Sequence, residues 1–242
     1  LVCVTSKGEA VLFRGTNPGD ASSWAYIGTF NVGEPIGRRC LAQLGADLVI
    51  ITRDGVAPIS RFLAGGRLSK RAAVSDKIRG AITAAVKDNG SRFGWQPIVY
   101  PNGNMVLFNS PVSSSAAVQF VSNTTTGAWA RFKDMNANCW ALLNDELYFG
   151  GSGTVFKADT GLDDDGAEIK TEAETAFSYL GNRGLLKQIT LARPIFKTNG
   201  TVGASVGISV DYATGPLTSS PVFSAPTSSA WDTSPWDTTP WG

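Results

Sequence analysis

The sequence has no histidine among its 242 residues. This absence excludes catalytic triads that depend on histidine, histidine metal sites and imidazole acid–base pairs. Cysteine is also scarce, since Cys3, Cys40 and Cys139 lie far apart without the paired spacing of a zinc or redox site. We interpret them as small apolar side chains of a protein that assembles in a reducing cytosol. No apolar run approaches the roughly 18 residues of a membrane-spanning helix, so we expect no membrane span.

Excess charge and paired acids are lacking too. The chain has 21 Lys and Arg against 20 Asp and Glu, so as a whole it is not a nucleic-acid polycation. No pair of carboxylates stands out as a hydrolytic site, because Asp134, Asp145 and Glu146 occupy turns where acids are common. We therefore predict that the protein is not an enzyme and that it holds no cofactor or metal. The 27 glycines and the hydrophobic fraction of 43% are typical of a β protein with many turns.

The stretch 127–159 is the most informative part of the sequence. Four short apolar runs, at 129–132, 139–143, 147–150 and 154–158, are separated by Asn, Asp and Gly. These turn residues tolerate positive φ, and runs of this length between them indicate consecutive hairpins. The stretch predicts one four-stranded antiparallel sheet that resembles a blade of a β-propeller.

The same pattern occurs near the N-terminus, from residue 24 onward. A repeat of about 30–40 residues predicts sheets that are stacked or radially arranged, because one such sheet cannot bury its faces alone. The alternative is that any two meanders look alike. The corresponding positions are Trp24 with Trp129, Cys40 with Cys139, Asp47-Leu48 with Glu146-Leu147, and Asp54-Gly55 with Ser152-Gly153.

Between the two copies, apolar residues recur at helical spacing. We expect one inserted helix at about 69–88, with a cap near Ser69 and a left-handed end at Asn89-Gly90. The apolar face of this helix is predicted to contain Val74, Ile78, Ala81, Ile82 and Ala85.

The chain as a whole is predicted to be mainly β, with a domain boundary between residues 160 and 166. Residues 1–160 are expected to form propeller-like β sheets that carry the inserted helix. Residues 161–218 are expected to form a small C-terminal β-sandwich-like domain. The expected strands of this second domain are 172–179, 187–196 and 204–212.

Residues 219–242 are rich in Trp and Pro, with Trp231, Trp236 and Trp241 at five-residue spacing. Prolines and short polar residues prevent a packed element there, while three tryptophans are costly to leave in water. We interpret the segment as a docking arm whose rings pack on a neighbouring subunit or on the second domain.

Two further segments carry opposite charge. Residues 61–92 contain eight Lys or Arg against two Asp, and residues 159–174 contain seven acids against Lys170. Three interpretations remain open: attraction between these segments within or between subunits, a solvated helix face, and contact with phosphate backbone. A calcium loop is the weaker reading of the acidic segment, because Gly161 stands where the first carboxylate ligand is needed. The candidate subunit-interface residues are Lys70, Arg71, Lys77, Arg79, Asp163, Asp164 and Asp165, with Trp231, Trp236 and Trp241 of the arm.

A succession of short motifs runs through most of the chain. They are Ser75-Asp76-Lys77-Ile78-Arg79, Gly94-Trp95, Tyr100-Pro101-Asn-Gly-Asn104, Thr126-Gly127-Ala128-Trp129, Asn138-Cys139-Trp140, Leu147-Tyr148-Phe149-Gly150-Gly151, Arg193-Pro194-Ile195-Phe196 and the Trp-Asp-Thr repeats of the arm. In these motifs the chain resembles virion structural proteins of tailed bacteriophages, which are similar in turn to the propeller-bearing hub or nozzle subunits of short tails. The motifs are architectural, and no site residue is carried over.

The resemblance implies a ring-forming component of a phage tail, a hub, nozzle or adaptor ring that lines the DNA passage. Its partners would be other copies of itself and other tail proteins, with transient contact to DNA. It would be present in the host cytoplasm during assembly and then in the tail of the virion. In this family the chain would extend further on its N-terminal side, before Leu1.

A carbohydrate-binding or hydrolytic β-propeller module is the alternative function. Such a module needs aromatic platforms, and paired carboxylates if it is hydrolytic, near the mouth of the ring. Trp95 and Trp140 are the candidates for stacking on a sugar, although a buried structural role for each is the expectation we prefer.

Overall fold

The computed structural model describes residues 1–63, 75–190, 195, 202–213 and 222–223. The chain divides into two compact units, Leu1–Asp163 and Asp164–Gly242, which are described separately. The mainly β class predicted from the sequence is confirmed, because strands far outnumber helices among the described residues.

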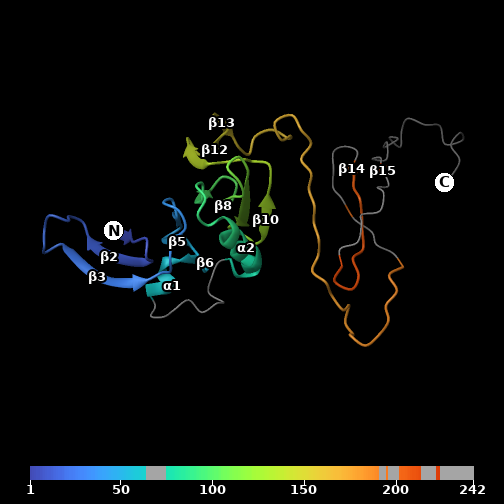
Figure 1. Ribbon diagram of the computed structural model, residues 1–242, viewed down its shortest axis with the longest axis horizontal. Helices are drawn as coiled ribbons and strands as arrows, with labels where there is room; N and C mark the ends of the chain where they lie inside the picture. The colour runs from blue at the N-terminus through green and yellow to red at the C-terminus, as the bar shows by residue number, and fades with distance from the viewer. Residues whose placement is uncertain (64–74, 191–194, 196–201, 214–221, 224–242) are drawn as a thin grey trace, which may run out of the picture. The chain divides into compact units, whose positions relative to one another are not determined.

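Unit 1 contains four antiparallel meanders, each formed by strands that are consecutive in the chain (Figure 1). We name them sheets A to D in chain order. Sheet A comprises β1 (Val2–Val4), β2 (Glu9–Gly15) and β3 (Trp24–Asn31), and sheet B comprises β4 (Leu41–Leu44), β5 (Asp47–Thr52) and β6 (Gly55–Pro58). Sheet C comprises β7 (Gln96–Tyr100), β8 (Met105–Pro111), β9 (Ala117–Asn123) and β10 (Trp129–Phe132), and sheet D comprises β11 (Cys139–Leu143), β12 (Glu146–Gly151) and β13 (Thr154–Lys157).

Three apolar layers hold the four sheets together in the order A, B, C, D. Alternate residues of a strand point to opposite faces, so a strand that is apolar throughout can serve two layers. In β5, Ile50 faces the layer shared with sheet A, whereas Val49 and Ile51 face the layer shared with sheet C. In β8, Phe108 faces sheet B and Leu107 faces sheet D. Sheets B and C are therefore covered on both sides.

The sequence repeat is present, but its boundary differs from the sheet boundary. Strands β3 and β10 begin at Trp24 and Trp129, and the following strands match in order as predicted. However, β10 pairs with β9 of sheet C, and the stretch 127–159 therefore does not form one four-stranded sheet. The prediction was wrong on this point because pairing between strands depends on the preceding hairpin, which lies outside the repeated segment.

The inserted helix is shorter than expected within the described residues. A 3-10 turn, η1 (Asp76–Ile78), leads into α2 (Arg79–Asn89), and residues 69–74 lie outside the described part. Helix α2 turns Ile82 and Val86 into the layer between sheets B and C, whereas Ala81 is exposed. Gly90 has a φ of −60°, so the expected left-handed end is not formed there.

A second short helix, α1 (Ile59–Leu63), follows β6 and was not predicted. Its Ile59 and Phe62 pack into the layer between sheets A and B.

Strand β7, the first of sheet C, contacts both β4 and β11, the first strands of sheets B and D. Within the described residues, however, the sheets close into neither a barrel nor a propeller.

Unit 2 has little regular structure in its described part. One short pair joins β14 (Val202–Gly203) to β15 (Val222–Phe223). The expected strand 172–179 is not formed, and neither are the described parts of the expected strands 187–196 and 204–212. Alternation of apolar residues specifies a strand only where a partner sheet buries one face, and residues 164–190 are all exposed. The local contacts are aromatic, with the ring of Tyr212 lying 4.9 Å from Phe177 and 6.4 Å from Tyr179.

Candidate assembly surfaces

The predicted basic residues that the structure describes already have partners within unit 1. Lys77 donates from Nζ to the carbonyl oxygen of Gly127 at 3.0 Å, which links η1 to the turn before β10. Arg79, the first residue of α2, forms an ion pair with Asp76 one turn earlier. Lys77 therefore ties the helical segment to sheet C, whereas the ion pair of Arg79 lies within that segment.

The remaining predicted interface residues fall into two groups. Lys70, Arg71, Trp231, Trp236 and Trp241 lie outside the described residues. Asp164 and Asp165 belong to a tight turn at 164–167, in which the backbone groups of Asp164 and Ala167 exchange hydrogen bonds of 2.9 and 3.0 Å, and Asp163 directly precedes it.

Unit 1 ends at Asp163. Asp164 and Asp165 are the first residues of unit 2. Attraction between the acidic and basic segments stays a prediction. Among the described residues, no group of three or more Cys, Asp or Glu is arranged to hold a metal ion. No helix in the described ranges is long and apolar enough to cross a membrane.

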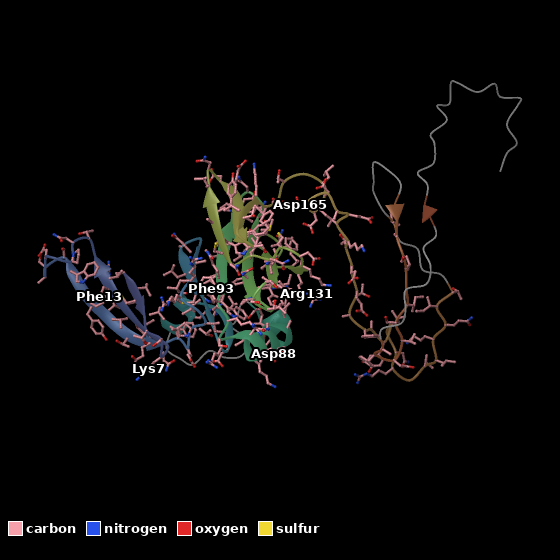
Figure 2. All side chains as sticks on the ribbon, turned by 45° about the horizontal axis from the view of Figure 1, so that its top comes forward. Lys7, Phe13, Asp88, Phe93, Arg131 and Asp165 are labelled. Atoms are coloured by element: carbon pink, nitrogen blue, oxygen red, sulfur yellow. The ribbon has the colours of Figure 1, made fainter. Side chains whose placement is uncertain are left out.

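Sheet A exposes an aromatic cluster on the face turned away from sheet B. Val2, Val4 and Leu12 point toward sheet B, so the alternating residue Phe13 points outward. The ring of Phe13 stacks on Trp24 across the strand pair, with centroids 5.7 Å apart and planes 14° apart. It also meets Tyr26 edge-on at 5.9 Å, and the Tyr26 side chain is 59% exposed. Figure 2 shows Phe13 on this sheet.

A β-bulge contributes to the exposure of this cluster. The pairing of β2 with β3 shifts between Leu12 and Phe13, which leaves Ile27 as an extra residue on β3. A bulge of this kind twists the strand pair and changes the direction of the side chains beyond it. Phe13, Trp24 and Tyr26 all lie on the far side of the bulge.

Sheet D exposes a mainly aliphatic surface on the face turned away from sheet C. Trp140 and Leu147 point toward sheet C, so the residues that alternate with them point outward. Leu143 and Val155 on this outer face are 61% and 73% exposed. The face also carries Ala141 and Tyr148, with Cys139 and Gly150 at one end of the strand pair.

A polar group is anchored beside these aliphatic side chains. The carboxylate of Glu146 accepts hydrogen bonds from Lys157 Nζ at 2.5 Å and from Tyr148 Oη at 2.8 Å. The hydrogen bond from Lys157, followed by the one from Tyr148, lowers the pKa of Glu146 below its ordinary value. The bond to Glu146 raises the pKa of Lys157 correspondingly, because the carboxylate favours the ammonium form.

A row of three amides crosses sheet C on the side that faces sheet D, with Asn109 and Gln119 buried and Gln96 partly buried. This row was not predicted from the sequence. Gln96, Asn109 and Gln119 stand next to one another on β7, β8 and β9. Gln96 holds Trp140 by accepting from its backbone N–H at 3.0 Å and donating to its carbonyl at 2.9 Å.

The two inner amides hold the connection that leads from sheet C to sheet D. Asn109 Nδ2 donates to the carbonyls of Gly94 and Ala137 at 2.8 and 2.9 Å. Gln119 Nε2 donates to Asn109 Oδ1 and to the Met135 carbonyl, both at 2.8 Å. The signal available in the sequence was an amide side chain in each of three mainly apolar strands, but the alignment of these amides depends on the register.

The two tryptophans considered for sugar stacking are buried in the structure. Trp95 packs in the layer between sheets B and C and donates from Nε1 to the Asn89 carbonyl at 2.9 Å. Trp140 packs between sheets C and D, 5.1 Å from the ring of Phe149. Neither ring can stack on a ligand in solution, so the preferred expectation of a structural role is confirmed for both.

A small hollow of about 240 Å³ lies between sheets B and C. Leu44 and Val49 line it from sheet B, and Val106 and Phe108 line it from sheet C. Ser122, Asn123, Thr124 and Gly127 complete its wall, and none of the lining residues is charged.

The chain matches no protein-family model, and no curated protein sequence is significantly similar to it.

Proposed function

We propose that the protein is a structural component of a phage tail, a hub, nozzle or adaptor ring that acts through protein–protein assembly and lines the DNA passage. One observation carries the proposal: the sheets of unit 1 stack through apolar layers, and the two end sheets expose apolar outer faces. Exposed apolar faces of this kind mark sites of protein association. In this proposal the protein is not an enzyme and needs no cofactor.

The arrangement of the sheets supports the propeller-like interpretation. Strands β4, β7 and β11 adjoin one another as the inner strands of neighbouring blades do. The four meanders then form an arc of blades, and other copies or other tail proteins provide the remaining contacts. Such a component is made in the host cytoplasm and ends in the tail of the virion.

The contact with DNA depends on basic residues that are not used internally. Lys77 and Arg79 have partners in unit 1, whereas Lys87 on α2 is exposed. Transient contact with the DNA backbone would therefore use Lys87 and the basic residues of 64–74, and it would weaken steeply as the salt concentration rises.

Light scattering on a sizing column over a range of protein concentrations, with negative-stain images of the main peak, tests the proposal. A defined ring of several copies supports it. A monomer at every concentration would count against self-assembly into a ring. Deletion of 230–242 in the same assay is expected to weaken association more than it lowers the melting temperature, if the arm docks between subunits.

Carbohydrate binding is the second candidate, and the aromatic cluster of sheet A favours it. Half-exposed rings such as Phe13, Trp24 and Tyr26 can stack on the apolar face of a sugar. A glycan array with the wild type and the Trp24→Ala variant tests this function. Binding that Trp24→Ala abolishes would support it, and the absence of any bound glycan would leave assembly as the role of the cluster.

A further inference from the structure

The hollow between sheets B and C is large enough for one small aromatic ring. Its volume of about 240 Å³ exceeds the roughly 150 Å³ of an apolar protein cavity that stays dry and binds benzene. The apolar part of its wall comes from Leu44 and Val49 of sheet B and from Val106 and Phe108 of sheet C. Water finds few polar partners against such a wall, so an apolar ring can occupy the space at little cost.

One polar side chain of the wall has no partner. Ser122 lines the hollow and is only 7% exposed, yet among the described residues no group hydrogen-bonds to its hydroxyl. The residues opposite it on β8 and β10 are Val106 and Trp129, and both turn toward sheet B as Ser122 does. A buried hydroxyl without a partner costs free energy, and a ligand that bonds to it recovers part of that cost.

The turn that completes the wall is fixed by hydrogen bonds. Asn123 Oδ1 accepts from the backbone N–H groups of Thr125 and Thr126 at 3.0 and 2.8 Å. The carbonyl of Gly127 accepts from Lys77 Nζ at 3.0 Å, which ties the end of the turn to η1. A wall that is already ordered loses little conformational entropy when a ligand binds, so the site is pre-formed.

We propose that this hollow binds a small neutral aromatic molecule that carries one hydrogen-bonding group, of the class of the phenols. In this site the ring packs against Val49, Val106 and Phe108, and the polar group bonds to the hydroxyl of Ser122, which can both donate and accept. A neutral ligand is favoured because none of the lining residues is charged and a buried ion would lack a partner. The inference goes beyond the proposed function, since assembly into a tail requires no small ligand.

An NMR titration of the full chain with phenol, and separately with toluene, tests the site. Toluene has a similar size but cannot hydrogen-bond to Ser122. Phenol is expected to bind saturably with a dissociation constant of about 1 mM or less. Its ring current should shift the methyl signals of Leu44, Val49 and Val106, whereas those of Leu147, which lies between sheets C and D, should stay in place.

Three variants separate the contributions to binding. Ser122→Ala is expected to weaken phenol binding about two- to tenfold, the value of one neutral hydrogen bond, and to leave toluene binding within about twofold. Ser110→Ala is the matched control, because Ser110 is also a buried serine of sheet C whose hydroxyl has no partner, but it does not line the hollow. It should leave the affinity for both compounds unchanged. Leu44→Phe places a ring in the hollow from a partly buried position and should weaken the binding of both, with its melting temperature as the check on folding.

Each outcome bears on the site. Phenol binding that Ser122→Ala weakens and Leu44→Phe abolishes would establish it. An equal effect of Ser122→Ala on phenol and toluene, or no effect on either, would overturn the hydrogen bond and with it the class of ligand. Shifts at methyl groups outside the hollow, or no saturation by either compound, would overturn the site itself. The proposed tail assembly is measured by the oligomeric state, so its failure is distinguishable from each of these results.

Discussion

Asn109 is the residue on which the junction between sheets C and D most depends. It is fully buried, donates to the carbonyls of Gly94 and Ala137, and accepts from Gln119. In Asn109→Leu these two carbonyls and one N–H of Gln119 lose their partner in a site that excludes water. Each of the three orphaned buried groups costs about 1–3 kcal/mol, and we therefore expect unit 1 to lose at least about 3 kcal/mol. This loss is a large share of the roughly 5–15 kcal/mol that stabilises a domain.

Urea unfolding followed by tryptophan fluorescence measures this loss. With a slope of about 2–3 kcal/mol/M, the midpoint should fall by at least about 1 M while the slope stays constant. The matched control is Asn102→Leu, since Asn102 Nδ2 also donates to a carbonyl, that of Asp145 at 2.9 Å, but at an exposed site. Water replaces that bond, so the control should lose less than about 1 kcal/mol.

The double variant Asn109→Leu/Gln119→Leu sharpens the test. Gln119 is buried and donates to Asn109 Oδ1. Removing both amides together therefore eliminates the Gln119 N–H that Asn109→Leu orphans and the Asn109 Oδ1 that Gln119→Leu orphans. The double variant should be less destabilised than the sum of the two single variants. If Asn109→Leu and Asn102→Leu have the same urea midpoint, the reasoning is refuted. The amide row would then not stabilise the junction between sheets C and D.

Three further predictions follow from single side chains. Leu147→Ala, which removes a buried side chain between sheets C and D, should cost about 2–5 kcal/mol in urea unfolding, whereas Leu143→Ala at an exposed position should stay within about 0.5 kcal/mol. Gly8→Ala should cost at least about 1–3 kcal/mol by the same assay, because the residue has a φ of +86° and an added Cβ would lie 2.4 Å from a backbone carbonyl; a neutral result would contradict the turn geometry. The pKa of Glu146 is lowered by Lys157, so its stabilisation is complete above the ordinary carboxyl pKa and is lost as the pH falls through the lowered value. Melting temperatures measured toward acid pH should therefore fall more in the wild type than in Glu146→Gln, and equal slopes would contradict the assignment.

Much of unit 1 was accessible from local sequence. The hairpins around Gly8, Asn104 and Gly153 form where turn residues separate short apolar runs, since the φ of these positions is positive and few residue types adopt it. The matching positions of the repeat, such as Trp24 and Trp129, also begin strands as predicted. These features depend on a few neighbouring residues, and local chemistry is enough to specify them.

The errors concern choices between competing partners. The strand that begins at Trp129 was predicted to start a new sheet, but it pairs with β9 of sheet C. The predicted repeat is therefore offset by one strand from the observed sheets. Within the described residues α2 begins at Arg79 after the 3-10 turn η1, whereas one helix was expected through this region. The expected cap near Ser69 lies outside the described residues, and Ser75 accepts from the Val56 N–H at 3.1 Å. Residues 172–179 alternate as a strand does, but all of them are exposed and none forms a strand.

The sequence by itself determined the mainly β class, the positions of most strands in unit 1 and the lack of histidine chemistry, because these depend on composition and on short-range backbone preferences. Only the tertiary structure decided which apolar faces are shared between sheets and which are left at the ends. It also decided that Gln96, Asn109 and Gln119 form one row while Phe13, Trp24 and Tyr26 form one exposed cluster. The physical reason is register: a shift by one residue moves every side chain of a strand to the other face, and pairing across long sequence separations fixes that shift.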